Sequence, residues 1–156
     1  MSTDVPIDVV VDALAAGNVE YVLIGGAAMM LHGCAYTTDD VDICSSREAA
    51  NVALLVAALA PFIWDVRTVL NGSNLTLSTE ADDVDILGTV TGLGEFEMLR
   101  KFAKQYRVGD RVIPMLTLEG LIVAKRAAGR TKDPLAHPEL EVMREAQDRL
   151  RDEDDR

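Results

Sequence analysis

The stretch that most constrains the fold of this chain runs from Tyr21 to Cys44. It opens on a short apolar run, which predicts a buried strand, and the run stops at Gly25 and Gly26. The glycines permit a tight turn into a short apolar helix expected at residues 27–31, and the free N–H groups and dipole of a helix start attract anions. The glycine pair is therefore a candidate phosphate-binding turn. The simple alternative is a tight turn that binds nothing.

The same stretch ends in a second predicted strand, which carries Asp40 and Asp42 two positions apart. Side chains alternate along a strand with period 2, so both carboxylates are expected on one face. Carboxylates held this close repel one another unless a cation neutralises them, and hard divalent cations prefer such oxygen ligands. The pair therefore predicts a metal site. The alternatives are a capping or turn role for Asp40 and a solvated turn position for Asp39.

The tetrapeptide Asp-Val-Asp-Ile occurs again at residues 83–86, although its flanks show no wider repeat. Asp85 lies inside the strand expected at residues 84–87, whereas Asp83 lies at its mouth. A third carboxylate on a neighbouring strand can complete a metal site that two carboxylates begin. Asp85 is therefore the third candidate ligand.

Charge is distributed unevenly along the 156 residues, whose net charge is -11. Residues 1–99 hold two basic against fifteen acidic residues, residues 100–132 hold nine against two, and residues 133–156 hold four against nine. The acidic balance argues against an extensive nucleic-acid surface. The basic segment could bind the anion that accompanies a metal ion. Alternatively, its charged side chains could lie on solvated helix faces.

Within the basic segment, Thr117 is expected to cap a helix that runs to about residue 128, where Gly129 ends it. Lys125 falls on the apolar stripe of this helix, where a lysine either extends to solvent or meets an anion. Arg130 and Lys132 follow in the next turn.

Periodicity over the whole chain predicts an α+β fold, a mixed sheet with flanking helices. Besides the elements above, helices are expected near residues 6–16, 45–60, 95–104 and 134–150, and strands near 64–70, 75–78, 106–108 and 111–115. Ser45 and Glu48 form a capping-box pattern for the second of these helices. We expect one domain over residues 1–150, followed by a charged, frayed tail over residues 151–156.

Several functional classes find no support in the sequence. No apolar run is long enough to span a bilayer, and Asp4 and Asp8 stand where a signal peptide would be basic, so we expect a cytoplasmic protein. Cys34 and Cys44 are expected as reduced core residues. The two histidines are expected to close the second helix (His32) and to lie in a loop (His137), and they form no catalytic triad.

Together these features resemble the nucleotidyltransferase superfamily, whose catalytic fold is shared with the beta-type DNA polymerases. The resemblance covers roughly residues 21–133. It is carried by the Gly25-Gly26 turn, the Thr38-x-Asp40-x-Asp42 strand, Asp85 on a later strand, and a helical Lys125 followed by Arg130-x-Lys132. The branch it is most similar to is a small bacterial one. This branch includes toxin-type nucleotidyltransferases of toxin–antitoxin systems and enzymes that modify aminoglycosides and lincosamides.

The resemblance implies a Mg²⁺-dependent enzyme that transfers a nucleoside monophosphate from a nucleoside triphosphate such as ATP to a hydroxyl of RNA, protein or a small molecule. It makes Asp40, Asp42 and Asp85 the catalytic ligands of two Mg²⁺ ions, with Asp85 also activating the attacking hydroxyl. The residues it implies in nucleotide binding are Gly25, Gly26, Thr38, Lys125, Arg130 and Lys132.

Two positions depart from the family pattern. Tyr36 stands where relatives often carry arginine, and Ala27 stands where they often carry serine. These departures keep open a catalytically degenerate relative that binds nucleotide or metal. The acidic charge leaves a further alternative, a calcium- or magnesium-binding interaction module, for instance one half of a two-gene system that neutralises a basic partner chain.

Overall fold

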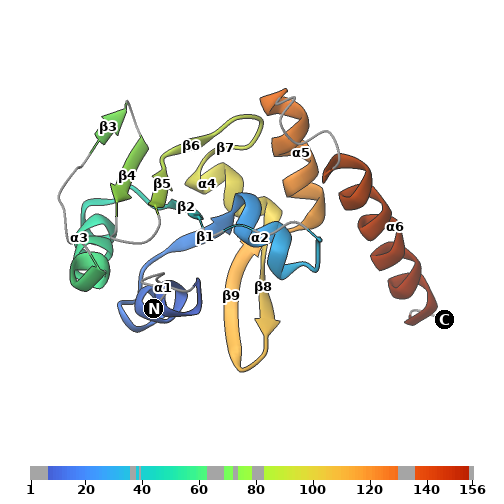
Figure 1. The fold of residues 1–156 in the computed structure, drawn as a ribbon, viewed down its shortest axis with the longest axis horizontal. Coiled ribbons are helices and arrows are strands. Elements are labelled where there is room, and N and C mark those ends of the chain that lie inside the picture. Colours follow the sequence, from blue (N-terminus) through green and yellow to red (C-terminus); the bar gives the residue numbers. More distant parts are fainter. Residues whose placement is uncertain are drawn as a thin grey trace.

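The computed structural model of the chain describes residues 7–35, 38, 40–62, 69–71, 74–78, 83–129 and 136–154. Its centre is a mixed seven-stranded sheet in the order β3-β4-β5-β2-β1-β9-β8 (Figure 1). The strands are β1 Tyr21–Ile24, β2 Val41–Ser45, β3 Val69–Asn71, β4 Asn74–Ser78, β5 Asp83–Leu87, β8 Ala103–Val108 and β9 Arg111–Leu116. A separate ribbon pairs β6 Thr89–Val90 with β7 Gly94–Glu95. The predicted α+β class is confirmed.

The helices of the described residues flank this sheet (Figure 1). They are α1 Ile7–Ala16, α2 Gly25–Leu31, α3 Ala49–Leu59, α4 Phe96–Leu99, α5 Leu118–Ala128 and α6 Ala136–Asp154, with 3₁₀ turns η1 Ala60–Phe62 and η2 Arg100–Phe102. Helix α6 lies beside α5 at one end of the molecule, and α3 lies at the other end. No described helix is both long and apolar enough to cross a membrane.

Strand β1 is the central element of the sheet. All four of its residues are buried, as expected for a strand that is covered on both faces. It runs antiparallel to β2 and parallel to β9, and β2 runs parallel to β5. These directions bring the end of β1 to the same edge of the sheet as the starts of β2 and β5.

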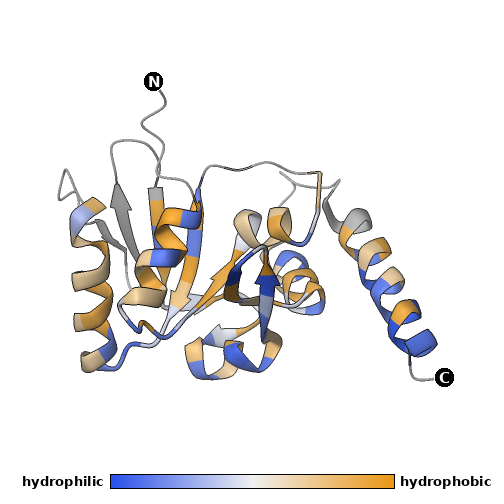
Figure 2. Ribbon diagram, turned by 90° about the horizontal axis from the view of Figure 1, so that it is seen from below, coloured by the Kyte–Doolittle hydropathy of each residue, from blue (hydrophilic) through white to orange (hydrophobic). Residues whose placement is uncertain are grey.

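The core is mainly aliphatic. Leu14 of α1, Leu23 of β1 and Ile43 of β2 are fully buried, and Leu140 of α6 is buried to the same extent. Burial of each such side chain contributes about 1.5–3 kcal/mol. Helix α3 is mostly apolar in Figure 2, and it leaves residues such as Val56 exposed on its outer side.

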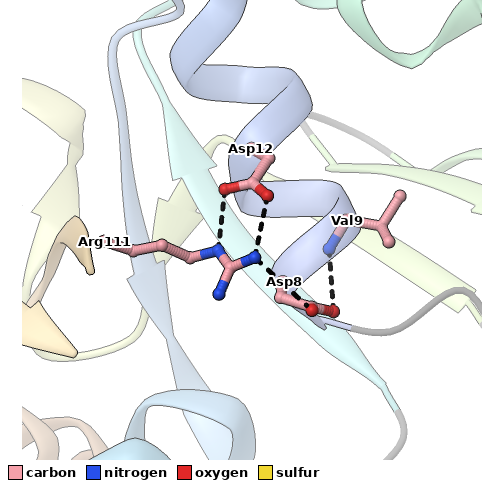
Figure 3. A network of polar contacts seen from close by, with 4 residues as sticks. All are labelled: Asp8, Val9, Asp12 and Arg111. Atoms are coloured by element: carbon pink, nitrogen blue, oxygen red, sulfur yellow. Dashed lines mark hydrogen bonds and ion pairs between the residues drawn. The ribbon is translucent and has the colours of Figure 1, made fainter. Parts of the chain in front are cut away.

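An ion-pair network ties α1 to the β8–β9 hairpin (Figure 3). The Arg111 guanidinium donates from Nε and Nη2 to the two carboxylate oxygens of Asp12, at 2.8 and 3.0 Å. Asp8 lies 3.6 Å from Nη2 of the same guanidinium. The hydrogen bond from Arg111 lowers the pKa of Asp12. One basic residue of the segment 100–132 is thus engaged with α1.

The prediction of a helix at residues 95–104 is wrong over the second half of this range. Helix α4 ends at Leu99, one 3₁₀ turn follows, and Ala103 already pairs with Leu116 in the β8–β9 ladder. Helical spacing of apolar residues was present, but hairpin pairing with β9 takes the backbone hydrogen bonds from Ala103 onward. The hairpin is therefore longer than the sequence indicated.

The start of α3 also differs from its prediction. Ser45 is the last residue of β2, and Glu48 is the N-cap residue, without a side-chain capping bond. Instead, Asn51 Nδ2 donates to the backbone oxygens of Glu20 and Ser46, at 3.1 and 2.9 Å. A buried amide, rather than a capping box, fixes the chain where β2 leads into α3.

Helix α6 contains His137 and Pro138 in its first turn, so the prediction of a loop at His137 is wrong. Proline is tolerated there because the first turn of a helix has no intrahelical partner for its N–H groups. The helix continues to Asp154, beyond the end predicted at residue 150. By contrast, the predicted Thr117 cap of α5 and its glycine end are confirmed: Thr117 accepts from Gly120 N, and Gly129 has a φ of 55°.

Candidate functional site

Gly25 and Asp42 touch where β1 leads into α2. Gly25 is the first residue of α2 and has a φ of +65°, a conformation that side chains disfavour. A Cβ atom added to Gly25 would lie 2.7 Å from Oδ2 of Asp42, closer than atoms can approach. Glycine is thus required twice, for its backbone angle and for the space that the carboxylate occupies. Sequence reasoning did not foresee this contact.

Asp42 and Asp85 are direct neighbours in the sheet. They are Cα partners in the parallel pairing of β2 with β5, so their side chains lie on the same face. Neighbouring strands are about 4.8 Å apart. Both side chains are half-buried, whereas Val84 and Ile86, which flank Asp85, are buried on the opposite face. We call Gly25, Asp42 and Asp85 the acidic site.

Asp40 and Thr38 lie at the approach to β2. The backbone N–H of Asp40 donates to Oγ1 of Thr38 at 3.2 Å, which shapes the turn into the strand. Asp40 is exposed and precedes Val41, the first residue of β2, while Thr38 is half-buried. Among the described residues the structure does not group Asp40 with Asp42 and Asp85 as a set of three ligands. Asp39 and Tyr36 lie outside the described residues.

The acidic site offers hard oxygen ligands of the kind that Mg²⁺ prefers. Among the residues that the structure describes, no three histidine, cysteine, aspartate or glutamate side chains are grouped so that they could hold a metal ion by themselves. Two adjacent carboxylates can still bind an ion whose shell is completed by water and substrate phosphates, as Mg²⁺ sites commonly are. The donor set fits such a shared site.

The basic segment does not converge on the acidic site as a block. Arg111 binds α1, Arg100 pairs with Glu97 at 3.3 Å, and Arg126 pairs with Glu141 of α6. Lys125 is half-buried in the last turn of α5, on the predicted inward side. Arg130 and Lys132 lie outside the described part of the chain. The segment is divided among several surfaces.

His32 ends helix α2 and Cys44 lies on β2, and neither side chain suits the chemistry of the acidic site. His32 is the C-cap residue of α2, as predicted, and its Nε2 lies 2.8 Å from the Leu116 carbonyl oxygen. Burial lowers its pKa, so the ring is neutral at pH 7. Burial also raises the pKa of the Cys44 thiol to about 11, which keeps the sulfur protonated and unreactive.

A scan of protein-family models finds none that matches this chain, and a search of curated proteins also finds no match. Solved structures do match. The lincosamide antibiotic adenylyltransferase LnuA, in a structure with lincomycin bound, has a TM-score of 0.68 at 19% identity, covering 90% of this chain and 99% of that one.

Two further structures match over most of both chains. The antibiotic-resistance factor ANT(2'')-Ia has a TM-score of 0.60 at 15% identity, covering 95% of this chain and 92% of its own. An antigenic nucleotidyltransferase-like protein from Paracoccidioides brasiliensis has a TM-score of 0.55 at 15% identity, covering 91% and 76%. At these identities the likeness establishes the architecture: the chain has the nucleotidyltransferase fold.

Proposed function

We propose that this chain, which has the nucleotidyltransferase fold, transfers a nucleoside monophosphate from a nucleoside triphosphate to a hydroxyl acceptor. The observation that carries the proposal is the acidic site, where Asp42 lies beside Asp85 in the sheet and against the glycine that begins α2. The matched structures support it, since LnuA is an adenylyltransferase and ANT(2'')-Ia was solved with adenylyl-2''-tobramycin.

Asp42 and Asp85 would hold Mg²⁺, and Asp40, two residues before Asp42, is the predicted third ligand. Bound there, the metal would stabilise the negative charge that develops on the phosphate oxygens during transfer. The carboxylates of Asp42 and Asp85 are half-buried, so their charges are only partly screened by water. A doubly charged cation offsets the repulsion between them.

The triphosphate is assigned to the Gly25–Gly26 turn, where the absence of side chains lets phosphate oxygens approach the backbone N–H groups. Lys125, Arg130 and Lys132 are assigned to neutralising the negative charge of the triphosphate. Thr38 is assigned to a hydrogen bond between its hydroxyl and the nucleotide. Ala27 is fully buried and offers no hydroxyl, so backbone N–H groups carry this part of the binding.

In the proposed reaction the acceptor hydroxyl oxygen attacks the α-phosphorus atom. A new P–O bond forms, the bond from the α-phosphorus to the bridging oxygen breaks, and pyrophosphate leaves. Asp85 accepts the proton of the attacking hydroxyl. RNA, protein and small molecules all carry suitable hydroxyls, and lincomycin and tobramycin in the matched structures are small-molecule cases.

The test is to incubate the full chain with Mg²⁺, each of the four nucleoside triphosphates labelled on the α-phosphate, and panels of RNA, protein and aminoglycoside or lincosamide acceptors. We expect label transfer to one acceptor class with release of pyrophosphate, and its loss in Asp42→Asn. The matched control is Asp110→Asn, which makes the same chemical change in an exposed hairpin turn. Transfer that survives Asp42→Asn would contradict the assignment.

The degenerate relative remains the second candidate, because the buried Ala27 replaces a hydroxyl that could bind phosphate. It differs in one measurable respect. Isothermal titration would show Mg²⁺ and a nucleoside triphosphate tightening each other's binding, while no acceptor is labelled. An acidic interaction module would instead bind Mg²⁺ with the same affinity whether or not the nucleotide is present.

A further inference from the structure

A groove of about 430 Å³ lies between the edge strand β8, the start of α5 and helix α6. Four basic side chains line it: Lys101 of η2, Lys104 of β8, and Arg144 and Arg151 of α6. We call this cavity the basic groove. It shares no residue with the acidic site, so it is a separate feature of the surface.

The basic groove gathers positive charge that its own acidic lining residues only partly neutralise. Its acidic lining residues are Glu119 and Asp148, and Asp148 already pairs with Arg151 at 3.3 Å. Lys101, Lys104 and Arg144 make no ion pair with any residue in the described ranges. Three cations are thus held near one another in a chain whose net charge is -11. Their mutual repulsion would be relieved by a bound anion.

The walls of the basic groove are fixed by the fold. Thr117 N donates to the Phe102 carbonyl oxygen at 2.8 Å, which joins the start of α5 to η2. Tyr106 on β8 meets the His32 ring edge-on, with ring centroids 4.8 Å apart. Helix α6 is held by the buried Leu140. The cations therefore project from three elements that are already in place, and binding costs little ordering.

We propose that the basic groove binds the phosphate groups of a nucleotide or nucleic-acid ligand. Cations that approach from η2, β8 and α6 suit a tetrahedral anion with several charged oxygens, since each can meet a different oxygen. The four cations and two carboxylates of the lining leave a net charge of +2, and a single planar carboxylate with one charge does not neutralise it. The groove is small, so it engages one or two phosphate groups rather than a long backbone.

The position of the basic groove connects it with α2. This helix begins at Gly25 in the acidic site and ends at His32, which contacts Leu116 and Tyr106 beside the groove. Seven helical residues span about 10 Å. The two sites are thus one short helix apart, and a phosphate-bearing ligand in the groove could reach the acidic site. Binding in the groove does not depend on whether transfer occurs.

The test is a binding titration of the full chain in EDTA, so that Mg²⁺ does not contribute. Inorganic pyrophosphate is followed by calorimetry, and a short labelled oligouridylate is followed by fluorescence anisotropy. We expect Lys104→Gln and Arg144→Gln each to weaken binding about tenfold, as for the loss of one charge-assisted contact. The two probes distinguish a small phosphate ligand from a phosphodiester chain, and tight binding of either supports the proposal.

The matched control is Arg107→Gln, which removes the same charge from the next exposed position but one on β8, where the side chain projects from the opposite face. Binding should stay within about twofold of wild type in this variant. Equal weakening by Arg107→Gln, no binding of either probe, or equally tight binding of a short polyglutamate peptide would each overturn the proposal. Thermal unfolding midpoints verify that the variants are folded.

Asp42→Asn separates this proposal from the proposed function. The variant should lose transfer and keep groove binding. A wild-type chain that binds pyrophosphate in the groove but transfers no nucleotide would overturn the proposed function alone. A chain that transfers nucleotide but binds neither probe in the groove would overturn only the proposal that the basic groove binds phosphate.

Discussion

The acidic site and the basic groove are assembled in opposite ways. The acidic site comes from adjacent strands, and its central contact, Gly25 with Asp42, is fixed by the β1–β2 ladder. The basic groove comes from η2 and β8, which are consecutive in the chain, and from α6, which is brought to them by packing beside α5. The difference teaches that alternation along a strand predicts the face on which a side chain lies, whereas a surface built by helix docking has no such signal in the sequence.

The largest expected effect is at the two carboxylates of the acidic site. Asp85→Asn should lower kcat by about 10²–10⁴-fold, because the proposed proton acceptor is lost while the shape is kept. Asp42→Asn should lower kcat by a similar factor. If the two act as a unit, the double variant will be little worse than either single one in steady-state transfer assays. Losses that multiply would mean that Asp42 and Asp85 work independently.

The contact between Gly25 and Asp42 can be tested with a matched glycine. Gly25 and Gly109 have φ values of +65° and +63°, but a Cβ on Gly109 would meet nothing within 4 Å. Alanine at either position should lower the free energy of unfolding by about 1–2 kcal/mol, from backbone strain. Only Gly25→Ala also displaces the Asp42 carboxylate, which should lower transfer about 100-fold.

Urea unfolding and transfer assays on both glycine variants provide the comparison. Equal losses of activity in Gly25→Ala and Gly109→Ala would show that Asp42 need not be placed by the turn.

The cap of α5 tests the wall of the basic groove. Thr117→Ala removes the oxygen that accepts from Gly120 N at 3.1 Å and should lower the free energy of unfolding by about 1 kcal/mol in urea titrations. Thr117→Ser keeps the hydroxyl and should keep most of the stability. If Thr117 holds the groove in shape, Thr117→Ala should also lower the affinity for pyrophosphate. Unchanged affinity in this variant would show that the cap is not needed for binding.

The smallest expected effect is at the exposed Asp12–Arg111 pair, where a basic residue of the same segment already has a partner. Because Arg111 lowers the pKa of Asp12 below 3.8, the folded state is stabilised at neutral pH and loses this contribution as pH falls through the lowered pKa. Asp12→Asn should therefore be slightly less stable than wild type at pH 7, with the difference shrinking in acid. Thermal unfolding at several pH values measures it, and a pH-independent difference would contradict the ion-pair origin.

Much of the fold could be predicted from local signals. The apolar run at residues 21–24, the Thr117 cap and the Gly129 end all act within a few residues, and the structure shows each of them. The predictions that failed depended on competition between distant partners. Ala103 joins β8 because β9 is available for pairing, and Ser45 stays in β2 because the sheet retains it.

The same distinction between local signals and distant partners applies to the candidate site. The sequence by itself placed Asp42 on a strand and a third carboxylate within a later strand, whereas Asp40, which was predicted on the same strand as Asp42, lies just before β2. Only the tertiary structure decided that Asp85 is the direct neighbour of Asp42 and that Gly25 leaves room for the Asp42 carboxylate. The functional roles of these residues stay predictions.

The tertiary structure also decided where the basic segment goes. A charge count shows nine basic residues at 100–132 but not their directions. Packing of α1, α5 and α6 sends Arg111 to Asp12, Arg126 to Glu141, and Lys101 with Lys104 into the basic groove. The physical reason is range: alternation and capping act between near neighbours in the chain, whereas ion pairs and grooves form between side chains that only the folded core brings together.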